Sequence, residues 1–418
     1  MPGALSVSNR AQLAYKLEGT YPTNFGVAQA GNGTLINFTG ESLDYAVKNE
    51  QSKAIRSDRQ PSDMVQVGAS PSGSINFEVN FQDIDPWLLG ALQNDWTHYG
   101  TAGTSAAFTG ALTLASGSIT NAVAPTGNDA YTNLQRGQWF TLTPPAGATQ
   151  AIKDYFASRP LRVHPTTAPT TTVITLDPAT PLNTTITTTA MAAGATITSS
   201  RAANGNVMKS YSLEVGHLDI TTFRQYLGMI PGKVDLSVQS GQIVTGSVDF
   251  MGRSMNPMAA STIMGTPTAA QVFTPANATK GVWDVLENGA TISTTTYIKS
   301  LSVSIDNSLR AQEAVSVFGN AGIAPGTIKI TGKAQMYFAD ATIYNKLVSG
   351  VASSFTVPIQ DIDGNGYVIH LPRIKYTAAK VGVGGLDQDN MLDVDFQAVM
   401  DTTAANATFQ QTAVIYRI

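Results

Sequence analysis

SINFEVNFQ, the stretch from Ser74 to Gln82, alternates between polar and apolar residues at every position. A period of two is that of a β-strand, because successive side chains point to opposite faces of the sheet. One set would be buried and the other would face water, as in an antiparallel sheet with one covered face. The set expected inside comprises Ile75, Phe77, Val79 and Phe81.

A short helix is expected directly after this strand. Asp85-Pro86 is followed by an apolar run that includes Trp87, Leu88 and Leu92. Asp is favoured at the N-cap of a helix and Pro at its first turn. The sequence therefore predicts a helix that begins at Pro86, with Asp85 as its capping residue.

The same succession of strand and helix recurs later in the chain. Residues 328–338 alternate in the same way and lead into a short apolar stretch around Ile343 and Leu347. We therefore expect 41–95 and 299–350 to be two copies of one unit, since internal repeats of this size mark a repeated structural element.

A second pair of similar segments supports this duplication. Val-Asp-Phe occurs at 248–250 and again at 394–396. Upstream of each, a Tyr stands five residues before a Pro, at Tyr226 and Pro231 and at Tyr367 and Pro372. Segments 208–255 and 353–402 are accordingly expected to be copies as well.

These repeats predict an all-β chain with two tandem β-sandwich or barrel domains, each with a short helix, plus an inserted small β domain. The expected order is an N-terminal arm (1–40), a first domain (41–95 plus 208–255) with the insertion at 96–207, a linker (256–296) and a second domain (297–418). Short strands are expected at 34–38, 137–142, 161–163, 172–176 and around 282–286, whereas 183–200 fits either loop or strand.

The composition narrows the class of protein. The chain has 418 residues, a net charge of −4, no cysteine and only 13% charged residues, against about 25% in ordinary domains. Disulfide scaffolds and thiol chemistry are excluded, and a protein that neutralises nucleic-acid phosphates would be basic. Residues 1–40 lack the pattern of a secretory signal, and no apolar window is long enough for a membrane span.

No arrangement of residues typical of catalysis or metal binding emerges. The four histidines, His98, His164, His217 and His370, are far apart, and His370 lies in an alternating stretch that favours a structural role. Asp361–Gly366 begins like a calcium loop, but Pro372 stands where the bidentate Glu should be, so a turn between strands is favoured. Asp393 and Asp395 form a pair of carboxylates expected to face solvent. We therefore expect no metal, no cofactor and no enzymatic activity.

Three stretches resemble the tail tube proteins of siphophages, the phages with long non-contractile tails. They are AIRSDRQ (54–60) leading into VGAS (67–70) and GSINFE (73–78), GQIVTGSVDFMG (241–252), and LPR (371–373) with QD (388–389) and LDVDF (392–396). The resemblance covers about 35–95, 208–255 and, more loosely, 297–402, and it leaves out the insertion.

This resemblance implies two tail-tube-type domains and a structural role in the virion tail. Rings of six such domains would stack into a tube that conducts DNA during ejection, after assembly in the host cytoplasm. Two domains per chain would then close a ring with three chains, a trimer with pseudo-sixfold symmetry. The implied partners are further copies of the chain, a tape-measure protein, tail-end proteins, and genomic DNA that passes without specific binding.

Two groups of residues would carry this role. The wet faces of the repeated strands would line the lumen, and their four acids to one lysine would repel phosphate; they comprise Asn76, Glu78, Asn80, Thr245, Ser247, Asp249, Lys333, Gln335, Tyr337, Asp393, Asp395 and Gln397. A charged loop would reach the next ring or subunit, through Lys48, Glu50, Lys53, Arg56, Asp58, Arg59 and Asp63.

Two other functions fit the same pattern. A tail-tip or decoration protein, or a β-rich adhesin, would use the insertion to bind a host receptor or glycan, and its acidic strand face would be ordinary outer surface. A polysaccharide hydrolase would need a convergent carboxylate pair between aromatic walls.

Overall fold

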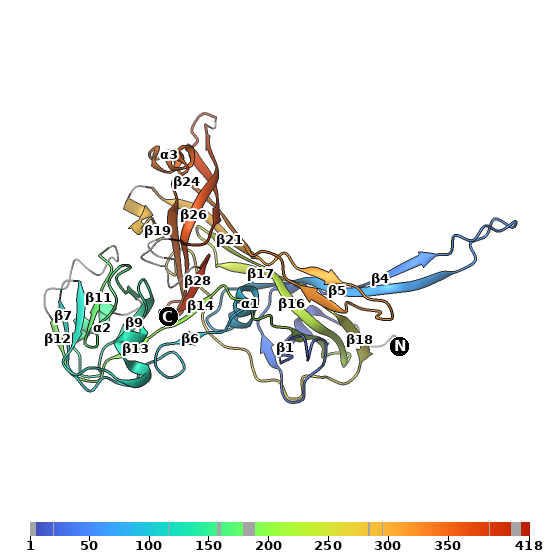
Figure 1. Cartoon of the computed structure of the whole chain (residues 1–418), viewed down its shortest axis with the longest axis horizontal. Helices are drawn as coiled ribbons and strands as arrows, with labels where there is room; N and C mark the ends of the chain where they lie inside the picture. The colour runs from blue at the N-terminus through green and yellow to red at the C-terminus, as the bar shows by residue number, and fades with distance from the viewer. Residues whose placement is uncertain are drawn as a thin grey trace.

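The computed structural model describes residues 6–19, 21–115, 117–156, 160–178, 189–282, 285–294, 296–383, 385–402 and 411–418. The fold is all-β, as the alternation predicts, with antiparallel sheets and three short α-helices in the described part (Figure 1). No helix in these residues is long and apolar enough to cross a membrane.

A long central sheet runs through both predicted domains. Each strand pairs antiparallel with the next, so the sheet has two ends far apart. In spatial order the strands are β3 (Gly40–Glu41) with β4 (Asp44–Gln51), β5 (Met64–Glu78), β17 (Thr245–Met251), β16 (Thr222–Gln239), β21 (Ile298–Asp306), β24 (Lys329–Tyr337), β27 (Met391–Ala398) and β26 (Gly366–Gly382).

Two of these strands, β16 and β26, are long enough to serve a second sheet as well. The first half of β16 pairs with β15 (Tyr211–His217) and β18 (Ser254–Ala259), and β15 pairs with β1 (Ala11–Leu17), which holds β2 (Thr34–Ile36). The first half of β26 pairs with β25 (Ser353–Gln360) and β28 (Val414–Arg417). The predicted arm at 1–40 thus contributes strands to the fold, including the one expected at 34–38.

The two halves of the chain repeat the same pairings. Val248 of β17 lies opposite Ile75 of β5, and Val394 of β27 lies opposite Ala334 of β24. The register of β16 against β17 shifts after Pro231, and that of β26 against β27 shifts after Tyr376. A β-bulge disrupts a ladder at one defined position, so bulges at matching places support a repeated unit.

These registers correct one detail of the sequence comparison. Pro231 pairs with Phe250, and the residue that pairs with the matching Phe396 is Tyr376. Pro372, expected to be the counterpart of Pro231, lies four residues earlier in β26. The equal Tyr-to-Pro spacings are therefore coincidental, because pairing partners and not residue type define equivalence in a sheet.

Helix α1 (Asp85–Leu92) confirms the predicted helix but not its cap. Asp85 is the first helical residue, and no side chain caps the N-terminus. Its carboxylate instead accepts hydrogen bonds from the Tyr367 hydroxyl and the Arg417 guanidinium, both at 2.6 Å. These partners lie 282 and 332 residues away in sequence, so a local pattern could not reveal that the carboxylate was already engaged.

The core is apolar and shared by the two halves. Trp87 of α1 is fully buried, and its ring lies 5.2 Å from those of Tyr15 and Phe250. Helix α3 (Thr342–Ser349) occupies the place expected for the second helix, and Ile343 is its buried residue. The remaining strands near the linker, β19 (Leu286–Glu287) and β20 (Ala290–Thr291), include the end of the expected 282–286 strand; residues 283 and 284 lie outside the described part.

The segment 96–207 has its own apolar core, separate from that of the central sheet. Expected strands are found as β9 (Trp139–Thr143), β10 (Leu161–Arg162) and β11 (Val173–Thr175). The others are β7 (Leu112–Ala115), β8 (Ser118–Asn121), β12 (Thr189–Met191) and β13 (Thr196–Thr198), with helix α2 (Gln150–Phe156). Part of the ambiguous stretch 183–200 is thus strand, and its residues before 189 are outside the described part.

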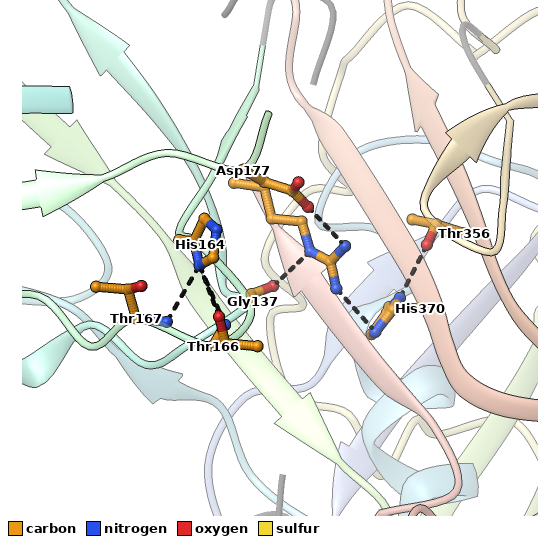
Figure 2. A network of polar contacts seen from close by, with 8 residues as sticks. Gly137, His164, Thr166, Thr167, Asp177, Thr356 and His370 are labelled. Carbon is orange, nitrogen blue, oxygen red and sulfur yellow. Dashed lines mark hydrogen bonds and ion pairs between the residues drawn. The ribbon is translucent and has the colours of Figure 1, made fainter. Parts of the chain in front are cut away.

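Two features attach this segment to the rest of the chain. Its entry and exit strands, β6 (Thr97–His98) and β14 (Ser200–Ala203), pair with each other, and β14 also pairs with β28. Arg162 forms a buried ion pair with Asp177 at 3.0 Å and donates to the Gly137 carbonyl. Its other amino group lies 3.3 Å from Nε2 of His370 in β26 (Figure 2).

Candidate assembly surfaces

One face of the central sheet is polar along its whole length. Residues opposite each other in neighbouring strands share a face, and the ladder aligns Ser74, Asp249, Lys233, Asp306 and Lys329 in one row across five strands. The other face is buried, with Val248 and Val234 in the adjacent row. The alternation in the sequence therefore separates a core face from a polar face, as expected.

Eleven of the twelve residues predicted on this face do lie on its strands. They alternate with the buried residues of β5, β17, β24 and β27. The prediction for Asn80 is wrong. This residue follows the end of β5 at Glu78 and is buried, with 8% of its surface exposed. The polar–apolar alternation of the sequence continues to Gln82, but the chain leaves the sheet before Asn80, so its side chain turns into the interior.

The charge on this face is more balanced than the sequence suggested. The residues predicted from the sequence, on four strands, included four acids and one lysine, but the face also includes β16, β21 and β26. From β5 to β26 it carries six carboxylates (Glu78, Asp235, Asp249, Asp306, Asp393, Asp395) and five lysines (Lys233, Lys329, Lys333, Lys375, Lys380). Strands β16 and β21, whose pairing is invisible in the sequence, supply three of the six added charges, and β26 supplies two more.

Acids and lysines on the face lie close to each other, along one strand or across two neighbouring strands. Lys233 donates to Asp235 at 2.6 Å, and this hydrogen bond raises the pKa of the lysine. Partial burial raises the pKa of the nearby Asp249 carboxyl, and Lys233 opposes that rise. Lys333 lies 3.9 Å from Asp395 and is well exposed. Exposed pairs of this kind contribute about 0–1 kcal/mol each, so they keep the face hydrated and nearly neutral rather than rigid.

The β4–β5 hairpin forms a second candidate surface. It extends far beyond the rest of the chain (Figure 1), and residues 46–67 are all exposed. Arg56 pairs with Asp58 at 2.7 Å at its tip, and Lys48 pairs with Glu313, which lies outside the hairpin. The predicted residues Glu50, Lys53, Arg59 and Asp63 also lie on the arm, and all seven face solvent.

Apolar residues on this arm were missed by the sequence reasoning, which singled out charges alone. Val65 and Val67 of β5 are half exposed, and Ile55 at the tip is completely exposed. A long hairpin with exposed apolar side chains is a typical site of association. The signal was present as the alternation of VQV (65–67), which continues the strand outward from the core.

The counterpart of this arm in the second half is short. The β22 (Arg310–Gln312) and β23 (Gly322–Ala324) hairpin joins β21 to β24, as β4 and the arm join β3 to β5. It lies along the base of the long arm, where the Phe318 carbonyl accepts from the Ala69 amide at 2.9 Å. Apart from the 96–207 segment, the two halves thus differ clearly in the length of this hairpin.

The family model for phage tail tube proteins matches residues 8–398. The chain belongs to the phage tail tube protein family. Membership agrees with the resemblance found in the sequence, and it indicates a structural role in the virion tail. The match includes the 96–207 segment of this tail tube protein, which the resemblance had left out. No curated protein matches the chain significantly.

The residues that superficially suggested other chemistry have structural partners in this tail tube protein. The Asp361 carboxylate accepts hydrogen bonds from the Asp363 and Asn365 amides at 2.9 Å, which confirms a turn between β25 and β26. Buried His370 bonds to Thr356 at 2.8 Å, and burial lowers its pKa well below the usual range. Within the described ranges no three His, Asp or Glu residues form a group suited to a metal ion.

Proposed function

We propose that this protein builds the tail tube of a siphophage from stacked trimeric rings. Each chain would supply two copies of one tube domain, so three chains would form a ring with pseudo-sixfold symmetry. The tube would act as a hollow conduit for DNA ejection, without enzymatic activity. Tape-measure and tail-end proteins would be its other partners, and assembly would take place in the host cytoplasm.

The observation that carries this proposal is the pairing of β16 with β21. Seven residue pairs, from Lys233 with Asp306 to Gln239 with Ser300, join two matched sets of strands into one sheet. The strand sets repeat in pairing order and in bulge position. When one unit of a sheet follows another in the same orientation, further copies of the chain can extend the sheet in the same way. The rotation between successive units can then close the copies into a ring.

The polar face supports a role as the wall of the conduit. Its carboxylates and lysines nearly balance, and hydroxyl and amide side chains separate them, as at Ser302 and Gln335. Strong DNA binding requires cationic side chains that release counterions from the phosphates. A nearly neutral, slightly acidic wall would let DNA pass without retention.

The β4–β5 arm supports the stacking of rings. Three long arms would alternate with three short β22–β23 hairpins around each ring, because each chain carries one of each. The long arms would reach an adjacent ring and contact it through apolar residues such as Val65 and Ile55, with the charges at the tip setting register.

Negative-stain electron microscopy of the concentrated protein tests this function. Hollow tubes with threefold or sixfold end views are the expected result. The matched variant replaces residues 50–65 with Asn-Gly, which closes a two-residue hairpin between the paired residues Asn49 and Gln66. Since the removed residues are exposed, this variant should fold normally and yield single rings without tubes.

Persistent monomers of the unaltered protein, even with the other tail proteins present, would contradict the tube. A surface-binding role for the 96–207 segment would then be favoured. Tubes of normal length from the shortened variant would contradict the stacking role of the arm alone.

A further inference from the structure

The central sheet ends in two edges that have no strand partner in the described part of the chain. One edge is formed by residues 375–382 of β26, which pair with β27 on one side only. The other is formed by residues 40–46, which pair only with β5. Open edges readily pair with another chain unless something prevents it.

The chain contains a template for joining such edges. The second half of β26 takes the place of the second half of β16, because Ala379 pairs with Val394 as Val234 pairs with Val248. Residues 40–46 take the place of β21, because Glu41 pairs with Ile75 as Leu301 pairs with Ala334. Since β16 and β21 pair within the chain, the two open edges are the matching surfaces of two copies.

We propose that β26 of one copy pairs antiparallel with residues 40–46 of the next copy, in the register of the β16–β21 junction. This inference rests on the proposed ring and identifies the edges and the register that close it. The register follows from equivalence with the pair Leu236 and Val303. It places Val381 opposite Leu43 and, on the polar face, Lys380 opposite Asp44.

The side chains fit this register. Lys380 and Asp44 are both exposed and carry opposite charges, and opposite charges in facing positions stabilise a sheet. Val381 is half buried against the core, and Leu43 is buried, so their pair extends the apolar face. A slip of one residue would exchange the faces. A slip of two would place Lys380 opposite Ser42 or Ala46 and lose the charge pair.

The free subunit protects one of these edges with its own side chains. The amide of Ser42 donates to Ser74 of β5, so the backbone groups of the next residue, Leu43, face outward. The Leu43 carbonyl accepts from the Tyr226 hydroxyl at 2.9 Å and from Arg224, and its amide donates to Glu41 at 2.8 Å.

The side chains that bond to the backbone of Leu43 also affect assembly. Glu41 is itself held by an ion pair with Arg224. Occupied backbone groups at an edge suppress pairing with wrong partners. When the ring closes, the backbone of Val381 would form hydrogen bonds with the amide and carbonyl of Leu43 in place of these side chains. Association would then replace existing hydrogen bonds, and not all of its bonds would be new.

Disulfide trapping tests the register, since the chain has no cysteine of its own. In this register Lys380 and Asp44 form a non-hydrogen-bonded pair, with Cα atoms about 4.5 Å apart, within the range for a disulfide. The variant K380C/D44C in assembled rings should therefore give covalently closed trimers under mild oxidation. The internal counterpart D235C/S304C should form its disulfide within one chain.

The off-register variant K380C/A46C is the matched control. It should give about tenfold less covalent trimer, because its cysteines lie outside disulfide range. Rings that form without a K380C/D44C disulfide, or that give more covalent trimer with K380C/A46C, would contradict the proposed register but not the proposed ring. Absence of rings from the unaltered protein would overturn the proposed function instead.

A charge-reversal series decides the matter if the cysteine variant does not assemble. K380D and D44K should each reduce ring formation, and the combined K380D/D44K variant should restore it. Equal ring formation by all three variants would overturn the proposed pairing of these two residues.

Discussion

Replacing Asp83 with Asn should stabilise the protein at neutral pH. Asp83 is only 6% exposed, and it accepts two hydrogen bonds from Asn37, from the backbone amide at 3.2 Å and from the side chain at 3.0 Å. These bonds join the N-terminal segment to the turn before α1. Burial nevertheless raises the pKa of the Asp83 carboxyl to about 6, since the hydrogen bonds only partly offset desolvation.

The sign of the effect follows from the direction of this shift. An Asp in the unfolded chain has a pKa of about 3.9, so the folded protein holds the proton more tightly. Stability is then fully present below about pH 4 and is lost as the pH rises to about 6. At about 1.4 kcal/mol per pKa unit the loss would be up to about 3 kcal/mol; residual contact with water should reduce it to about 1.5 kcal/mol.

Urea denaturation at low protein concentration, between about pH 4 and pH 7, measures this directly. The stability of Asp83→Asn should equal that of the unaltered protein at the acid end and exceed it by about 1.5 kcal/mol at the neutral end. Asp340→Asn is the control, because it removes the same charge from an exposed position. A difference between Asp83→Asn and the unaltered protein that stays constant across the pH range would refute the reasoning.

Two further substitutions probe packing and attachment. Gly332→Ala should lose about 1–3 kcal/mol of stability in the same denaturation assay, because an added Cβ would lie 2.2 Å from the Phe396 ring. In the control Gly382→Ala the Cβ would meet nothing closer than 4.0 Å, so stability should change far less. Equal losses in the two variants would contradict this account. Arg162→Met should cost about 3–5 kcal/mol because it removes the buried ion pair between Arg162 and Asp177. Limited proteolysis should show earlier cleavage within 96–207, whereas an unchanged cleavage pattern and midpoint would show that the pair contributes little.

The sequence determined which residues form strands and which face of each strand is buried. The period of two around Phe77 and around Met336 is a local property, and burial of the apolar set follows from the hydrophobic effect alone. The repeated Val-Asp-Phe segments and the tail tube resemblance could be identified for the same reason: they are written in consecutive residues. The helix at Trp87 was likewise predictable from its apolar run.

Only the tertiary structure decided which strands became neighbours. Backbone hydrogen bonds join β16 to β21, and these bonds are alike for every residue type, so the pairing leaves little mark in the sequence. Long-range pairings of this kind place β16 and β26 in the sheet, and these two strands carry three of the five lysines of the polar face. The burial of Asn80 and the engagement of Asp85 by Arg417 likewise depend on where the chain leaves the sheet and on contacts between residues hundreds of positions apart. Periodicity fixes the face of a strand, whereas long-range packing fixes its partners.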